Sequence, residues 1–143
     1  MTTPNHQIRC YSAALKMLMR REHSKLELFN KLKLKLKGYD DEIIDSAITQ
    51  LTEQNYQSDE RFAEAFILMR FNQGKGPVRI ASELKLRGIS SFNLSDFDWF
   101  KSAKEIRKKK FGDLDSSDFK EQAKQKRFLQ SRGFSLDQIN QSF

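Results

Sequence analysis

Runs of lysine and arginine are the sequence features with the clearest capacity for chemistry. Lysine alternates with leucine over residues 31–37, and residues 107–110 form an uninterrupted Arg-Lys-Lys-Lys run. Like charges at this density repel one another, so a helix carrying them would gain from an anionic partner. A solvated helix face explains the first run as well, and favourable interaction of cations with a helix C-terminus explains the second. Both interpretations stay open.

Charge is distributed unevenly along the chain. The net charge is +7, with +7 on residues 1–37, −6 on residues 38–70 and +6 on residues 71–143. Two basic regions flanking an acidic one favour a polyanionic partner, either nucleic acid or an acidic protein surface, whereas solubility alone is the competing explanation. The candidate partner-binding or DNA-binding side chains are Arg20, Arg21, Lys31, Lys35, Arg79, Lys85, Arg87, Arg107, Lys108, Lys109, Lys110, Lys124, Lys126, Arg127 and Arg132.

Motifs for catalysis and metal binding are incomplete. Gly74-Lys75-Gly76 has the wrong spacing for a phosphate-binding loop, and no Ser or Thr follows the lysine. Glu22-His23 lacks the second histidine of a helical zinc motif. The chain has two histidines and one cysteine, too few to favour a metal site. We therefore predict a binding protein rather than an enzyme, with no catalytic residue, cofactor or metal.

The single cysteine and the hydropathy pattern bear on localisation. Cys10 cannot form an intrachain disulfide, which suits a reducing compartment. No apolar run approaches the length of a membrane span, and residues 1–9 lack the apolar core of a signal peptide. We expect a cytoplasmic protein with no membrane partner, present as a monomer.

Helices are expected to position the basic side chains. Apolar residues recur at helical spacing over about residues 11–21, and Ser24 with Glu27 forms a capping box that starts a second helix. The alternation over residues 31–37 also fits a strand. The capping box and the i, i+4 spacing of the leucines favour a helix, which Gly38 is suited to end.

Start and stop signals farther along also predict helices. Acidic residues 40–42 suit a helix N-terminus, and Asn55 can end that helix in a left-handed conformation. Ser58 or Asp59 is expected to cap the next helix. After a break at residues 72–77, Pro77 restarts the chain in the first turn of another helix, where its missing N–H costs nothing.

The last third of the chain carries further caps. Ser95 is expected to cap a helix that contains Trp99, which we place in the core rather than on a base-stacking surface. Residues 115–118 offer caps for a helix that ends at Gly133, and residues 135–138 form a second capping box before a short final helix.

Similar segments recur along the chain. Residues 24–35 superpose on residues 76–87, and a basic–Gly–apolar stop occurs at residues 37–39, 87–89 and 132–134. An aromatic-x-x-Ala-x-x-apolar helix precedes each such unit. Amphipathic helices resemble one another in general, which is the alternative explanation. The recurrences predict three-helix units in tandem, forming an elongated, curved array that binds along an extended surface.

The ordered set of motifs resembles the RecX family of RecA recombinase modulators. Each motif is weak alone, but their order over residues 11–143 is specific. The first repeat of the family is matched by Arg-Arg-Glu-His-Ser-x-x-Glu-Leu-x-x-Lys-Leu at residues 20–32, the second by residues 59–63 and 74–89, and the third by residues 98–99, 110–112 and 126–134.

The resemblance implies an all-α protein that lies in the groove of the RecA–DNA filament and bridges protomers. It implies modulation, typically inhibition, of the recombinase, ATPase and coprotease activities, with effects on DNA repair and recombination. Single- or double-stranded DNA is a further expected partner. The alternative is a helical protein that binds nucleic acid directly, without RecA.

The expected organisation is a disordered segment over residues 1–10, then three-helix repeats over residues 11–57, 58–95 and 96–143. Only ten residues separate Gly88 from Trp99, which is short for the family's helix at that point. The third helix of the second repeat is therefore expected to be truncated or merged with the helix through Trp99.

Overall fold

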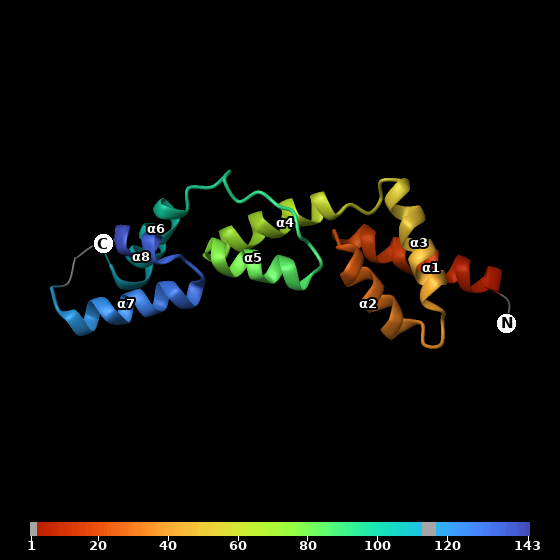
Figure 1. The fold of residues 1–143 in the computed structure, drawn as a ribbon, viewed down its shortest axis with the longest axis horizontal. Helices are drawn as coiled ribbons and strands as arrows, with labels where there is room; N and C mark the ends of the chain where they lie inside the picture. The colour runs from red at the N-terminus through yellow and green to blue at the C-terminus, as the bar shows by residue number, and fades with distance from the viewer. Residues whose placement is uncertain (1–2, 113–116) are drawn as a thin grey trace. The chain divides into compact units, whose positions relative to one another are not determined.

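All regular secondary structure in the described residues is α-helical, as predicted. The computed structural model describes residues 3–112 and 117–143, and within those ranges it contains eight helices and no strand. The helices are α1 (Thr3–Arg20), α2 (Lys25–Lys35), α3 (Asp41–Glu53), α4 (Asp59–Asn72), α5 (Pro77–Leu86), α6 (Trp99–Phe111), α7 (Phe119–Arg132) and α8 (Leu136–Gln141) (Figure 1). No helix in the described ranges is both long enough and apolar enough to span a membrane.

The described chain divides into two units. The first contains the described residues up to Ala65 together with Leu86–Phe92. The second contains Phe66–Lys85 together with the described residues from Asn93 to Phe143. Helices α1, α2 and α3 therefore belong to the first unit and α6, α7 and α8 to the second, while α4 begins in the first unit and continues into the second.

The first unit buries the apolar faces of its three helices together. Ile44 and Leu51 lie on one face of α3, and both are fully buried with Leu28 and Leu32 of α2. Full burial of a side chain of this size stabilises a fold by roughly 2 kcal/mol. Cys10 of α1 completes this core, and burial raises the pKa of its thiol.

The expected disorder of residues 1–10 is wrong for residues 3–10, which form the first turns of α1. Cys10 lies one turn before Ala14 on the same helix face, so it extends the buried stripe towards the N-terminus. One turn earlier, the His6 ring stacks on Tyr39 with centroids 4.0 Å apart. Cysteine and histidine continue the apolar face here, which a pattern of aliphatic residues did not reveal.

The predicted capping box at Ser24 is present. The Ser24 hydroxyl accepts a hydrogen bond from the Glu27 amide at 3.1 Å, and the Glu27 carboxylate accepts one from the Ser24 amide at 3.3 Å. The alternating segment that follows is helical to Lys35, so the strand interpretation is wrong. Helical rotation places its leucines on different faces, with Leu32 fully buried and Leu34 76% exposed.

Buried polar groups join α3 to α4. The Gln57 side-chain amide donates to the His23 carbonyl at 3.2 Å and to the Asp59 carboxylate at 2.9 Å. Its side-chain oxygen accepts a hydrogen bond from the Thr52 hydroxyl at 2.7 Å. Asn55 takes the left-handed conformation expected of it, with φ 67°. These bonds satisfy the polar groups where the chain leaves α3.

Backbone contact joins the α4–α5 turn to the end of α7 in the second unit. The Gly76 amide donates to the Arg132 carbonyl at 2.8 Å, and the Val78 amide donates to the Gly133 carbonyl at 2.9 Å. A Cβ atom at Gly76 would overlap the Gly133 backbone, and one at Gly133 would overlap Arg79. The two chain segments can therefore approach this closely only because both positions are glycine.

Residues 87–98 contain turns and bends but no helix, so neither a shortened third helix nor an extension of α6 is present there. Asp98, rather than the predicted Ser95, caps α6, because its carboxylate accepts from the Lys101 amide at 3.1 Å. The Ser95 amide and hydroxyl both donate to the Asn93 side chain, at 2.9 and 2.6 Å, which closes a local turn instead.

The remaining helix ends follow the sequence signals. Trp99 is buried as expected, and its indole N–H donates to the Leu94 carbonyl at 2.7 Å. Asp118 caps α7. Of the other predicted caps, Ser117 precedes the cap and is exposed, and residues 115 and 116 lie outside the described residues. The Ser135–Gln138 capping box opens α8.

We predict that Gly133→Ala destabilises the chain more than Gly38→Ala does. Both glycines have positive φ, at 100° and 85°, but only Gly133 has Arg79 against the position of the added Cβ, whereas Gly38 has open space. Conformational strain alone should cost about 1 kcal/mol, and the overlap should raise the cost at Gly133 to about 3 kcal/mol. Urea unfolding, monitored by circular dichroism, measures the unfolding free energy of each variant. Equal losses in the two variants would contradict the close approach of Gly133 to Arg79.

Candidate functional site

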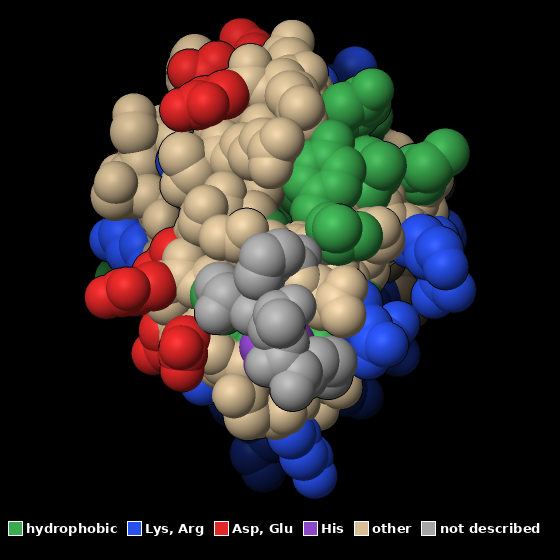
Figure 2. All heavy atoms as spheres, turned by 90° about the vertical axis from the view of Figure 1, so that its right-hand side faces the viewer, with side chains coloured by type: hydrophobic (Ala, Val, Ile, Leu, Met, Phe, Trp, Pro, Cys, Tyr) green, Lys and Arg blue, Asp and Glu red, His purple; other side chains and the backbone are tan. Residues whose placement is uncertain are grey.

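The predicted basic residues at the surface of the first unit differ in how far acidic groups offset them. Arg20 and Lys35 are exposed at the C-terminal ends of α1 and α2. Arg21 and Arg87 both approach the Glu27 carboxylate, with N–O distances of 3.5 and 3.8 Å. On the face drawn in Figure 2, several lysine and arginine side chains lie beside the hydrophobic patch on the right, and the acidic side chains lie on the left of the view.

Lys31 forms a hydrogen bond with the buried His23 ring. The Lys31 ammonium donates to His23 Nε2 at 2.9 Å, which leaves Nδ1 of the neutral ring to donate to the Arg21 carbonyl at 3.0 Å. Burial lowers the pKa of His23, and the positive charges of Arg21 and Lys31 lower it further. His23 is therefore held neutral, as part of the segment that links α1 to α2.

Arg107, a predicted partner-binding residue, is a core side chain instead. It is 1% exposed, its Nε donates to the Ser142 carbonyl at 2.9 Å, and its guanidinium stacks on the Phe143 ring at 4.7 Å. The dense basic run in the sequence thus contains one structural arginine. Helix periodicity turns this residue inward, towards α7 and α8, while its neighbours in the run turn outward.

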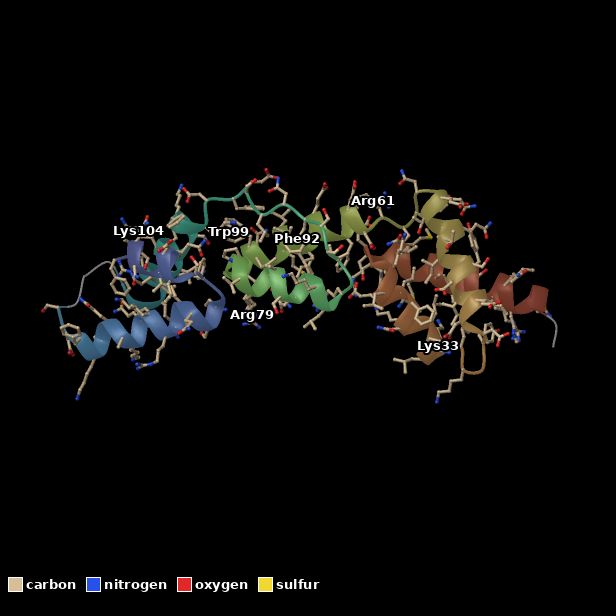
Figure 3. All side chains as sticks on the ribbon, viewed as in Figure 1. Lys33, Arg61, Arg79, Phe92, Trp99 and Lys104 are labelled. Atoms are coloured by element: carbon tan, nitrogen blue, oxygen red, sulfur yellow. The ribbon has the colours of Figure 1, made fainter. Side chains whose placement is uncertain are left out.

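The other predicted residues of α5, α6 and α7 remain accessible. Lys108 is partly buried at the edge of α6, and Arg132 is partly buried at the end of α7. The exposed members of the set are Lys85, Lys109, Lys110, Lys124, Lys126, Arg127 and Arg79, the last of which is labelled in Figure 3.

Four cations converge at the turn between α4 and α5, and we call Arg70, Lys75, Arg79 and Arg132 the turn cluster. The Arg70 guanidinium donates to Glu83 at 3.0 Å, and Arg79 lies 3.7 Å from the same carboxylate. Burial lowers the pKa of Lys75, and the charges of Arg79, Arg132 and Arg70 lower it further. The cluster therefore carries more positive charge than Glu83 offsets.

The sequence predicts half of the turn cluster. Arg79 and Arg132 belong to the predicted partner-binding residues, whereas Arg70 and Lys75 do not. The spacing around Lys75 does not fit a phosphate-binding loop, so that motif does not identify it. The available signal was that Arg70, Lys75 and Arg79 all flank the predicted helix break at residues 72–77, where a turn brings such neighbours together.

A small cavity lies beside the turn cluster. Its volume is about 170 Å³, and it is lined by Asn72, Gln73, Gly74, Ile106, Lys109, Lys110, Phe128 and Arg132. Lys110 and Arg132 both approach the Phe128 ring, at 5.5 and 5.2 Å from its centroid. Positive charge therefore continues from the turn to the C-terminal end of α6, next to a partly exposed aromatic ring.

Within residues 3–112 and 117–143, no group of three or more His, Cys, Asp or Glu side chains is arranged to hold a metal ion. Around the turn and the end of α6, the surface combines cations with a partly exposed aromatic ring, an arrangement that can bind an anionic partner.

Profiles of three RecX domains match the chain. They are the first, second and third three-helix domains of RecX, at residues 10–51, 58–94 and 96–142 respectively. The match to the second domain contains α4 and α5 followed by the non-helical segment, so this chain has two helices where the family description has three.

Relatives of similar length align over most of the chain. A protein of Acinetobacter baylyi named Regulatory protein RecX is 40% identical over 90% of this chain and 82% of its own length. One of the same name from Halorhodospira halophila is 38% identical over 89% of this chain and 81% of its own length. A crystal structure of RecX from Lactobacillus salivarius has a similar fold, with TM-score 0.79 and 24% identity over 97% of this chain and 95% of that one.

We predict that Arg107→Gln destabilises the chain by about 3 kcal/mol, because it removes a buried cation and leaves the Ser142 carbonyl without its donor. Lys109→Gln, two residues along α6 and exposed, removes the same charge and should change stability by less than about 0.5 kcal/mol. Chemical denaturation of both variants checks this. If Arg107→Gln loses little unfolding free energy, the Arg107 side chain is not buried as described.

We also predict a histidine-dependent loss of stability in mild acid. The pKa of His23 lies below its ordinary value of 6.5 in the folded chain, so the unfolded chain takes up a proton first as pH falls. Stability from the neutral ring is fully present above the ordinary value and is lost as pH falls below it. The unfolding free energy of the parent and of His23→Asn, measured between about pH 5 and 8, should converge as pH falls. Parallel curves would contradict the buried neutral ring.

Proposed function

Because this chain belongs to the RecX family, we propose that it is a regulatory protein that binds a RecA–DNA filament and modulates its activities, with inhibition as the direction. The names of its relatives support a regulatory role. The mechanism is thermodynamic linkage. A protein that prefers one state of the filament shifts assembly and activity by its difference in affinity between the two states.

The proposal depends on two exposed leucines, Leu34 and Leu86. Each lies between two basic residues, and the two occupy equivalent positions in the first and second repeats. Helix α2 ends with Lys33-Leu34-Lys35. Helix α5 ends with Lys85-Leu86, and Arg87 follows directly. Leu34 and Leu86 are each 76% exposed. Leucines this exposed add little to folding, so their repeated placement favours a role in binding.

A repeated surface fits a repeated partner. A filament offers the same protomer surface at successive positions, and a chain with two equivalent contact groups can engage two of them. The second contact then forms at high effective concentration, which raises the overall affinity without new chemistry. The lysines and arginine around each leucine favour an apolar depression with an acidic rim on the partner.

The proposal assigns no catalytic step to the chain and places its activity in the cytoplasm. Modulation of the recombinase, ATPase and coprotease activities of the filament would change DNA repair and recombination. Binding energy is sufficient for such regulation, because assembly and activity of the filament are themselves equilibria that a bound protein can bias.

Direct nucleic-acid binding without a RecA partner is the second candidate. The excess of cations in the turn cluster favours it, and so does the net charge of +7. The two candidates differ in partner requirement. A direct binder holds naked DNA as tightly as it holds the filament, whereas a filament regulator gains affinity when protein and DNA are assembled.

We predict tighter binding to RecA–single-stranded-DNA filaments than to free RecA or naked DNA. Co-sedimentation measures the first affinity and fluorescence anisotropy the other two. The double variant Leu34→Gln/Leu86→Gln should keep its helicity, because glutamine is a good helix former and both positions are exposed. It should bind the filament about ten-fold more weakly, as expected for loss of central apolar contacts.

Leu136→Gln is the matched control for that variant. Leu136 is 71% exposed at the start of α8, but its neighbours are Ser135 and Asp137 rather than basic residues. It should bind the filament like the parent. Equal affinity of the parent for filament and free RecA, or equal losses in the double variant and the control, would overturn the proposal.

A further inference from the structure

The turn cluster is built by the backbone rather than by flexible surface side chains alone. The Lys75 amide donates to the Arg70 carbonyl at 3.0 Å, and the Gly76 amide donates to the Arg132 carbonyl at 2.8 Å. Arg79 Nη1 lies 3.4 Å from the Ser131 carbonyl. Cations from α4, the turn, α5 and α7 are therefore held around one point of the second unit.

Positive charge in this cluster exceeds its compensation. Within the part of the chain that the structure describes, Glu83 is the one acidic side chain that pairs with the cluster, and it serves both Arg70 and Arg79. No acidic side chain in that part lies within ion-pair distance of Lys75 or Arg132. Arg132 instead faces the Phe128 ring. Two of the four cations thus pair with Glu83, and the other two have no acidic side chain within ion-pair distance in the described residues.

Lys75 lies among other cations. Burial lowers the pKa of its ammonium, and the positive charges of Arg79, Arg132 and Arg70 lower it further. An anion placed among these groups would attract all of them and offset their mutual repulsion. The arrangement therefore suits an anionic ligand.

The cations extend along the surface rather than forming one isolated point. Lys109, Lys110 and Arg132 line the cavity together with residues 72–74 of the turn. The charges of Lys110 and Arg132 both lie near the Phe128 ring. A row of cations around a partly exposed aromatic ring suits a polymer that alternates anionic and flat apolar groups.

We propose that the turn cluster binds the phosphodiester backbone of a nucleic-acid strand. Each arginine guanidinium that has free N–H groups can contact two phosphate oxygens at once, and a strand presents one charge at every nucleotide along this row. Carboxylates of an acidic protein surface are single charges at irregular spacing, and they offer nothing to the aromatic ring. The inference rests on the proposed function, since it names the component of the filament that this surface meets.

Binding of a single-stranded oligodeoxynucleotide to the full chain, without RecA, tests the assignment over a series of salt concentrations. Lys75→Gln should weaken binding about five-fold near 0.1 M salt and lower the log–log salt slope by about 0.7, the value for one phosphate contact to a single strand. Lys75→Arg, which keeps the charge, should restore binding.

Lys104→Gln is the matched control. Lys104 is exposed on α6 of the same unit and lies well away from Arg79 in Figure 3, so this variant loses an equal charge outside the cluster. It should bind within about two-fold of the parent, because separated surface charges are screened by salt. Losses equal to those of Lys75→Gln would mean that only the net charge attracts DNA, and would overturn the site.

Thermal unfolding separates a binding role for Lys75 from a structural one. Lys75 forms no ion pair in the described residues, and its neighbours are cations, so Lys75→Gln should leave the melting temperature of the chain undiminished. A lower melting temperature would attribute the weaker binding to a damaged turn, which would overturn the assignment. In this variant, the proposal requires weaker binding and undiminished stability together.

Two competitors identify the anion. Polyglutamate of matched charge, or inorganic phosphate at matched phosphate concentration, should displace the oligonucleotide far less well than unlabelled oligonucleotide does. Equal displacement by polyglutamate would point to an acidic protein partner, and equal displacement by phosphate to an isolated anion. Either result, or a parent that does not bind DNA, would overturn this inference. Leucine-dependent co-sedimentation with filaments would in that case leave the proposed function standing.

Discussion

The hydrogen bonds between the backbone at Gly76 and the backbone at residues 132–133 fix most of what is chemically distinctive in the second unit. Because no side chain separates the two segments, the start of α5 and the end of α7 lie closer than packed helices normally do. Lys75 and Arg79 flank one partner in this contact, and Arg132 contributes the other. This backbone contact therefore brings the residues that carry these cations to one turn.

In the first unit, side chains rather than backbone groups join the end of α1 to the start of α4. There the Gln57 amide links the His23 carbonyl to the Asp59 carboxylate, and Asp59 also accepts a hydrogen bond from the Lys25 amide at 2.9 Å. Burial lowers the pKa of the His23 ring next to this network, so the folded chain favours the neutral ring, and protonation in mild acid opposes folding. The backbone hydrogen bonds of the second junction involve no titrating side chain. The first junction is therefore the one expected to depend on the protonation of a histidine.

Local signals identified most helix ends, with the cap of α6 at Asp98 rather than Ser95 as an exception, whereas contacts between distant segments were not visible in the sequence. The capping boxes at Ser24 and Ser135 and the left-handed stop at Asn55 depend on residues a few positions apart, so the sequence identified them. The early start of α1 depends on His6 meeting Tyr39, and the burial of Arg107 depends on the chain end at residues 142–143. Arg70 and Lys75 join the turn cluster for the same reason, because Arg132 reaches them only through the fold.

Cations that look alike in the sequence have different surroundings in the fold. Arg107 and Lys75 each add one positive charge to the net charge of +7, but the first is stabilised by carbonyl and aromatic partners, whereas the second is destabilised by its neighbours. A ligand that binds only the folded chain stabilises it by an amount set by ligand concentration and affinity. For an anion at Lys75, part of that stabilisation is relief of a repulsion already present in the free protein. The cations that repel one another at this turn are therefore also the ones available to bind an anion.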